Sequence, residues 1–411
     1  MGKMIMNLIH RADRSPEKFK ALKFQQKLAH QIGLKTTVLV TYQAMFNKDI
    51  TDYLKKDQQE YDDEIGIHLE GIKCDEFREK FKMEERALYL YSFEMKKKIL
   101  TEIFRKFKDI FGFLPNSIGS YYLDARTLNW IKEKYPVVKT SIVSCFEEGV
   151  HMFAGNKNQW YLFSEGGPWG VYYPSQKNSF CPAKDADDAV DIVALPHLNR
   201  DMLLALTSRD DYFSSHPANI IRGKANNGPD SPYIYKFIDK WIEQLKYNQV
   251  VYYNVFVSPS WMVDGNNFEV PSEYARKMYK KTLEYLKFKV KEELVEDMTV
   301  NDFGEYYRKQ AEYGAADINL WDDILCGSKR QMFWYLNPYF RIAVDPNIGG
   351  SICDLRPYAG QVDKNLGPDT ENLANGNYPF LISAEHRGGT NGGSIHTCKI
   401  NYKGKTVSLL D

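Results

Sequence analysis

Three of the eight histidines lie at or near the ends of short apolar, β-branched runs, where strands are expected. These are His10, His68 and His197, and the acidic residues Asp13 and Glu70 follow two of the same runs. Side chains alternate along a strand, so His68 and Glu70 should share one face. Imidazole and carboxylate together suit a divalent ion such as zinc, which at a catalytic site keeps one position open for water. A metal lowers the pKa of that water and makes a nucleophile near neutral pH.

We therefore expect a divalent ion, with zinc as the first choice, held by His10, Asp13 and His68. Asp13 and Glu70 are also candidates for catalysis, and Glu70 either ligates the ion or orients His68 from behind. His197 would act as general acid or stabilise the transition state. A single histidine at a strand end is often a hydrogen-bonded structural residue, but three at the same end of one sheet favour a site.

The elements that would position these residues alternate along the first three quarters of the chain. Seven runs predict strands: Ile5–His10, Thr36–Tyr42, Glu64–Glu70, Ser117–Tyr122, Lys139–Cys145, Asp191–His197 and Val250–Ser258. Apolar residues at helical spacing lie between them, and Ser15-Pro16 and Gly33 mark where the first helix starts and stops. Alternating strands and helices indicate a parallel sheet, whose length favours closure into a barrel over an open doubly wound sheet.

The composition changes after about residue 311, where glycine becomes frequent and charged residues become scarce. Short β-branched runs separated by turn residues predict a small all-β domain there. We therefore expect two domains, an α/β barrel over residues 1–310 and a β-rich domain over residues 311–411.

Composition excludes several classes of protein. The 411 residues include 54 Lys and Arg against 54 Asp and Glu, so the formal net charge is zero and no basic excess favours nucleic acid. No run is long and apolar enough to span a membrane, and no signal peptide is visible at the start, as in a cytoplasmic protein or one whose export signal has been removed. The sequence does not predict an oligomeric state.

Aromatic residues make up 14% of the chain, and several lie in loops beside predicted strand ends. Flat aromatic faces can stack on sugar rings, which favours a polysaccharide or oligosaccharide partner. The candidate substrate-binding residues are Tyr122, Asp124, Trp169, Tyr172 and Trp261. Asp124 could equally be the N-cap of the helix that follows it.

On these residues the chain resembles the polysaccharide deacetylases of the glycoside hydrolase/deacetylase barrel superfamily, and most closely an uncharacterised bacterial family with a C-terminal β domain. The resemblance covers about residues 5–295 and rests on Thr36–Val40, Glu64–His68, Ile118–Tyr122 and Leu195-Pro196-His197. It implies a distorted (β/α)7-type barrel followed by a small C-terminal all-β domain. It also implies a carbohydrate-active hydrolase, with Asp13 at the position of the superfamily's acidic pair.

The sequence departs from the superfamily pattern at three places. Ile72 stands where a second metal histidine is expected, Arg14 follows Asp13 in place of a second acid, and the fourth strand lacks its arginine. A metal site would have to be rebuilt from His10, Asp13, His68 and Glu70, or has been lost. Two alternatives to a metal-dependent deacetylase follow: a metal-free glycoside hydrolase using paired carboxylates, and a non-catalytic glycan-binding protein on a degenerate barrel.

Overall fold

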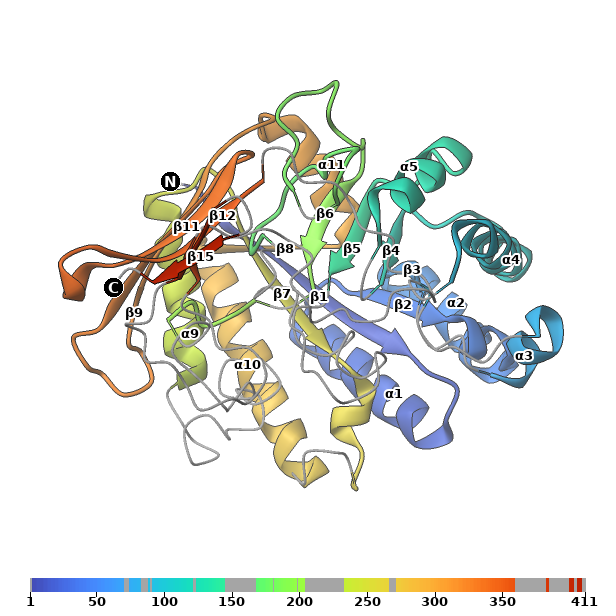
Figure 1. Ribbon diagram of the computed structural model, residues 1–411. Coiled ribbons are helices and arrows are strands. Elements are labelled where there is room, and N and C mark those ends of the chain that lie inside the picture. The colour runs from blue at the N-terminus through green and yellow to red at the C-terminus, as the bar shows by residue number, and fades with distance from the viewer. Residues whose placement is uncertain are drawn as a thin grey trace.

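The computed structural model describes residues 2–69, 74–82, 88, 91–120, 123–144, 168–179, 181–197, 199–203, 233–265 and 271–358, and the backbone of strands at 382–383, 399–402 and 405–408. Two sheets organise these residues, with helices around the first (Figure 1). No helix in the described part of the chain has the length and apolar character of a membrane span.

The first sheet is parallel and contains all seven strands predicted from the sequence. Its order is β6-β5-β4-β3-β2-β1-β7, and an eighth strand, β8, pairs with the first half of β1. The strands are β1 (Met4–Ala12), β2 (Thr37–Thr41), β3 (Glu64–His68), β4 (Ser117–Gly119), β5 (Thr140–Ser144), β6 (Val193–Pro196), β7 (Val251–Val257) and β8 (Val295–Met298). Apart from the position of β7, the order follows the chain in one direction, as in a barrel and unlike a doubly wound sheet.

Among the described strands, no pairing closes the barrel, because β6 and β7 are the two edges of the sheet. Two asparagine side chains span the gap between β6 and β7, which we call the seam. Asn199 donates to the carbonyl of Tyr252 at 2.9 Å and accepts from the backbone N–H of Asn254 at 2.7 Å. The Asn254 side chain donates to the carbonyls of Pro196 and His197, both at 3.0 Å. These side-chain amides pair with backbone N–H and C=O groups of the two edge strands, which would pair with each other in a closed barrel. Because the described edges are joined through side chains and not by strand pairing, the sheet is a curled half-barrel.

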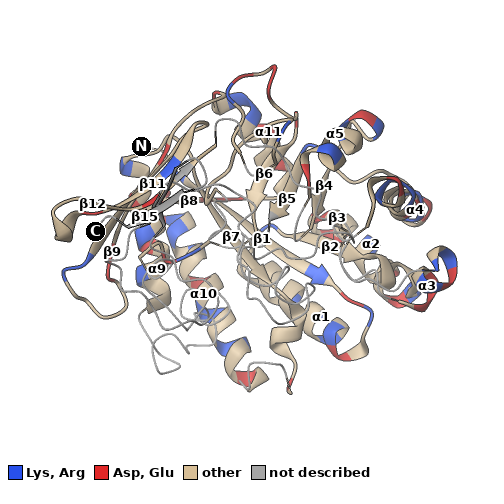
Figure 2. Cartoon of the chain, viewed as in Figure 1, with Lys and Arg blue, Asp and Glu red and all other residues tan. Residues whose placement is uncertain are grey.

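Helices cover the outer face of the sheet, and their ends carry the expected signals. Ser15 caps α1 (Pro16–Ile32) by accepting from the Lys18 N–H, and Gly33 ends it in the left-handed conformation. The other longer helices are α2 (Lys48–Tyr61), α3 (Asp75–Phe81), α4 (Phe93–Phe111), α5 (Ala125–Lys134), α9 (Tyr233–Glu243), α10 (Ser272–Lys291) and α11 (Val300–Gln310). Figure 2 shows both signs of charge interspersed on α3, α4 and α5, as the zero net charge suggests.

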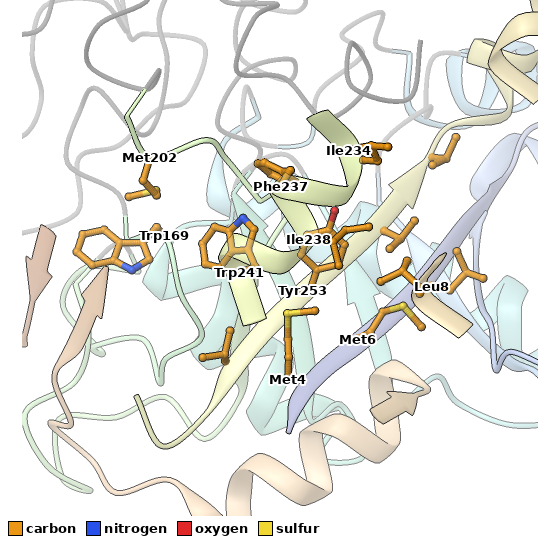
Figure 3. Close-up of a cluster of buried hydrophobic side chains, with 14 of the residues drawn as sticks. Met4, Met6, Leu8, Trp169, Met202, Ile234, Phe237, Ile238, Trp241 and Tyr253 are labelled. Atoms are coloured by element: carbon orange, nitrogen blue, oxygen red, sulfur yellow. The ribbon is translucent and has the colours of Figure 1, made fainter. Parts of the chain in front are cut away.

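The alternation of β1 defines the two faces of the sheet. Met4, Met6 and Leu8 point into an apolar cluster with Phe237 of α9 and Tyr253 of β7 (Figure 3). The odd-numbered neighbours Ile5 and Ile9 belong to a different cluster on the concave face. Even-numbered residues of β1 therefore face the helices, and odd-numbered residues face the interior of the half-barrel.

Helix α11 lies across the N-terminal ends of the strands. Val300 and Asn301 at its start donate backbone hydrogen bonds to Thr37 of β2 and Glu64 of β3. Gly304 lies against Thr140 of β5 so closely that a Cβ would stand 2.3 Å from the Thr140 methyl group. This end of the half-barrel is therefore filled by a helix, which leaves the C-terminal ends of the strands for a site.

The second sheet is antiparallel and runs in the order β15-β14-β13-β12-β11-β10-β9. Its strands are β9 (Asp317–Asp322), β10 (Gln331–Leu336), β11 (Phe340–Asp345), β12 (Ser351–Pro357), β13 (Ile382–Ser383), β14 (Lys399–Tyr402) and β15 (Lys405–Ser408). Trp321 of β9 packs edge to face on Trp241 of α9 at 5.4 Å between ring centroids. The all-β region expected near the C-terminus is thus present, and it shares an apolar cluster with the helices of the first sheet.

Candidate active site at the C-terminal ends of the strands

Two of the three strand-end histidines share the concave face of the half-barrel. His68 ends β3 and His197 follows β6, and both are 2% exposed. Their rings lie 6.2 Å and 4.3 Å, between centroids, from the same ring, that of Phe256 on β7. Phe256 belongs to the interior apolar cluster. The structure therefore brings His68 and His197 to one end of the barrel interior, with an aromatic ring against both.

Asp13 follows β1 at the same end and is 4% exposed. Its Oδ2 accepts from both Nε and Nη2 of Arg11, at 3.1 and 3.0 Å, and lies 3.7 Å from the ammonium nitrogen of Lys18. Arg11 also donates to the hydroxyl of Ser258, just beyond β7, at 3.0 Å. The carboxylate of Asp13 is thus held between two cations, and the Arg11 guanidinium connects β1 to β7.

His10 points the other way, into the layer between the sheet and the helices. Its ring nitrogen Nδ1 is hydrogen-bonded to Oε1 of Gln26 on α1, and Nε2 lies 2.5 Å from the Tyr279 hydroxyl on α10. Burial lowers the pKa of His10 to about 4, against the opposing effects of Gln26 and Asp63. This corrects the expectation that His10 joins Asp13 and His68 around one ion, because His10 occupies the opposite face of β1.

Asp124 acts as a helix cap and as one half of an ion pair. It accepts from the Thr127 N–H at 2.8 Å at the start of α5, and its other oxygen lies 2.7 Å from the buried ammonium of Lys96. Burial alone would raise the pKa of Asp124, but Lys96 and the Thr127 hydrogen bonds hold it below its usual range. These contacts account for Asp124 without a ligand.

The aromatic residues expected to stack on sugars are buried in this structure. Trp169, Tyr172 and Trp261 are 2%, 7% and 3% exposed. Trp169 packs on Trp334 of the second sheet, and the Tyr172 hydroxyl donates to the Ser179 carbonyl at 2.8 Å. Trp261 belongs to the cluster that joins the sheet to α9 and α10. This corrects their assignment as open sugar platforms, because their faces are covered by protein. Glu70 and Tyr122 lie outside the described residues.

The candidate metal ligands described at the C-terminal ends of the strands do not fit a catalytic metal. His10 is on the other face, and Asp13 is engaged by Arg11 and Lys18, whose positive charges oppose a cation. Within the described ranges, one group of three or more His, Cys, Asp and Glu side chains has ligand atoms close enough together for one ion: His30, Asp57 and Asp63. Asp63 immediately precedes β3, at the opposite end from His68.

Sequence reasoning missed Arg11 and the two seam asparagines, Asn199 and Asn254. A usable signal existed for two of them, since Arg11 and Asn254 are polar residues inside strands that are mostly apolar. A buried polar side chain needs a partner, so its presence in a core strand marks a contact that the sequence alone does not identify.

A curled parallel half-barrel with polar residues at the C-terminal strand ends and an added antiparallel sheet defines an α/β half-barrel fold. Residues 18–320 match the sequence family described as a domain of unknown function with a solved structure (DUF3863), and the chain belongs to that family. No curated protein matches it.

Solved structures with this fold include a protein from Parabacteroides distasonis described as a glycoside hydrolase/deacetylase. It is 16% identical, with a TM-score of 0.65 over 92% of this chain and 94% of that one. A Pseudomonas aeruginosa protein described as a polysaccharide deacetylase is 9% identical, with a TM-score of 0.45 over 75% and 92% of the two chains. One from Mycobacterium smegmatis with the same description is 11% identical, with a TM-score of 0.42 over 76% and 94%.

Proposed function

We propose that this protein is a carbohydrate-active hydrolase that removes acetyl groups from a glycan at the C-terminal end of the half-barrel. The observation that carries the proposal is that the Arg11–Asp13 ion pair lies at the C-terminal end of β1, the same end of the half-barrel at which His68 and His197 both pack on Phe256. The description of the Parabacteroides distasonis protein with the same fold names both glycosidic and deacetylase chemistry, and the residues here suit acyl transfer better.

Hydrolysis of an acetyl group needs a base for the attacking water, a donor for the oxyanion and an acid for the leaving group. In this proposal one imidazole, that of His68, takes the proton from water as the water oxygen attacks the carbonyl carbon. The guanidinium of Arg11, fixed by Asp13, donates hydrogen bonds to the developing oxyanion. His197, which carries a proton at the start of the cycle, donates it to the departing sugar amine or hydroxyl as the bond from that atom to the carbonyl carbon breaks. Acetate is released, and proton exchange with solvent returns both imidazoles to their starting states.

The glycosidase alternative needs two carboxylates facing one sugar ring. Of the candidates in the described part of the chain, Asp13 is paired with Arg11 and Asp124 caps α5 against Lys96. Neither carboxylate is placed as the acid of a glycosidase: that of Asp13 accepts two hydrogen bonds from Arg11, and Lys96 and Thr127 hold the pKa of Asp124 below its usual range. Deacetylation is therefore the activity to test first, with Glu70 and Tyr122 kept as candidate residues.

The test incubates the purified full chain with N- and O-acetylated oligosaccharides and measures released acetate and reducing sugar. We expect acetate, and a loss of at least about 100-fold in kcat/KM in Arg11→Gln, by analogy with removal of an oxyanion donor. Arg78→Gln on exposed α3 is the matched control and should retain full activity. Reducing sugar without acetate would favour the glycosidase, and binding without either product would favour a non-catalytic glycan-binding protein.

A second arm tests the metal-dependent version, in which zinc takes the place that we give to Arg11. Acetate release that a chelator abolishes, that zinc restores and that Arg11→Gln leaves intact would overturn the role of Arg11 and support the metal. Activity that survives chelation supports the mechanism written here.

A further inference from the structure

A second polar cluster lies on the helix side of the sheet, at the N-terminal end of β3. It consists of His30 near the end of α1, Asp57 in α2, and Asp63 between α2 and β3. Strands rise about 3.3 Å per residue, so His68, five residues after Asp63, is roughly 16 Å away along β3. The cluster is therefore separate from the candidate active site.

The three side chains offer one ligand atom each, and these atoms all lie within 4.8 Å of one another. His30 Nε2 and Asp63 Oδ2 are 2.9 Å apart, and their side chains are 7% and 3% exposed. Asp57 is 6% exposed, and its Oδ2 is buried without a hydrogen-bond partner. An ionised oxygen in such a position is costly unless a cation or a donor meets it.

The charges around the cluster suit a cation. The groups that act electrostatically on Asp57 include His30, Asp63 and Glu60, so two further acids face it together with one imidazole. A neutral imidazole and two carboxylates would balance the charge of one divalent ion.

The neighbours of the cluster hold its ligands in place. The side-chain amide of Gln26 donates to Asp63 Oδ2 at 2.8 Å, and the side-chain oxygen of Gln26 is hydrogen-bonded to the His10 ring. The His30 ring stacks on Tyr61, with centroids 3.7 Å apart and planes 10° from parallel. Partners of this kind behind the ligands fix their orientation in metal sites. Asp63 also lines a surface groove with three further acidic residues, Asp62, Glu64 and Asp302.

We propose that His30, Asp57 and Asp63 form a binding site for a divalent transition metal, zinc in the first instance, that ties α1 to α2 and to the start of β3. Imidazole nitrogen with carboxylate oxygen is a common zinc donor set, with bonds of about 2.0–2.2 Å. Two ligands on one tetrahedral zinc stand about 3.4 Å apart, so rotation of the Asp57 side chain brings its unpartnered oxygen to the ion. Water completes the coordination.

The test uses the full chain after treatment with a chelator and measures binding of Zn²⁺ by calorimetry, with Co²⁺ absorption as a report of coordination. We expect one equivalent of Zn²⁺ and a rise in Tm with the metal. Asp57→Asn and His30→Gln should each lower the affinity at least about tenfold. His68→Gln and Asp13→Asn, at the other end of the barrel, serve as controls and should bind as tightly as the wild type.

The Tm measured without metal shows whether a variant has a folding defect, so that such a defect is not mistaken for a loss of metal binding. Asp57→Asn removes a buried charge, so its metal-free Tm should equal or exceed that of the wild type, while the rise with Zn²⁺ is lost. The proposal is overturned if the wild type binds no Zn²⁺, if binding survives Asp57→Asn and His30→Gln together, or if it is lost in His68→Gln. It is likewise overturned if Asp57→Asn lowers the metal-free Tm and leaves the Zn²⁺ response unchanged.

Discussion

The side-chain amide of Asn254 on β7 donates to the backbone carbonyl of His197 beyond β6, at 3.0 Å, across the seam where the two edge strands do not pair. The same nitrogen reaches the Pro196 carbonyl at 3.0 Å. One buried amide therefore joins the two edges of the half-barrel and fixes the backbone that presents a candidate catalytic histidine. The seam is part of the site as well as of the fold.

Replacing Asn254 by aspartate should test this link. The carboxylate keeps the shape of the side chain but cannot donate to the two carbonyls, which would be left buried and unpaired at a cost of about 1–3 kcal/mol. We expect a lower free energy of unfolding in urea and, under the proposed function, a lower kcat. Asn129→Asp on α5 is the control: its amide also donates to backbone carbonyls but is only partly buried, so water can replace those hydrogen bonds and the loss of stability should be smaller. Unchanged stability in Asn254→Asp would show that the seam does not depend on this amide.

Removal of the Arg11 charge should affect stability as well as activity. Asp13 is almost fully buried and accepts two hydrogen bonds from Arg11. Arg11→Met leaves that carboxylate with Lys18 alone, and breaking a buried pair from one side costs about 3–5 kcal/mol. The double variant Arg11→Met/Asp13→Asn should recover most of the loss in urea unfolding, since no uncompensated charge remains. A double variant as unstable as the single one would mean that Arg11 acts through packing alone.

The low pKa of His10 should make the protein lose stability in acid. Its pKa is about 4 in the folded protein, below the value of about 6.5 in an unfolded chain. Between pH 6.5 and 4 the unfolded state binds a proton that the folded state does not, so the free energy of unfolding falls as the pH falls. The full effect is about 3 kcal/mol. Urea unfolding at pH 7.5 and 4.5 should show a smaller pH dependence in His10→Gln than in the wild type, and equal dependence would contradict the assignment.

The variant Asp124→Asn distinguishes a structural role of Asp124 from a role in glycan binding. Asn at an N-cap still accepts from the helix N–H groups, so Asp124→Asn should keep α5 capped but leave the buried ammonium of Lys96 without its counterion. We expect a loss of about 1–3 kcal/mol in the free energy of unfolding, with affinity for acetylated oligosaccharides unchanged. Weaker glycan binding at unchanged stability would instead restore Asp124 to the substrate site.

The sequence by itself determined the elements of this fold. β-Branched runs located seven parallel strands, and local capping signals such as Ser15-Pro16 and Gly33 located the first helix, because strand periodicity and helix caps depend on near neighbours in the chain. It also gave the strand-end positions of His68, His197 and Asp13. Strand β8 was missed, since four residues with two acids carry little apolar periodicity.

The tertiary structure decided which of these residues meet. Alternation along β1 already separates His10 from Asp13, but only the packing of Met4, Met6 and Leu8 against α9 shows which face is the interior. Likewise the sequence places Trp169 in a loop, and only the tertiary structure shows that Trp334 of the second sheet packs against its ring. The seam contact between Asn254 and His197 and the cluster of His30, Asp57 and Asp63 join residues from different elements. Such contacts depend on how layers pack, and no local pattern of residues encodes them.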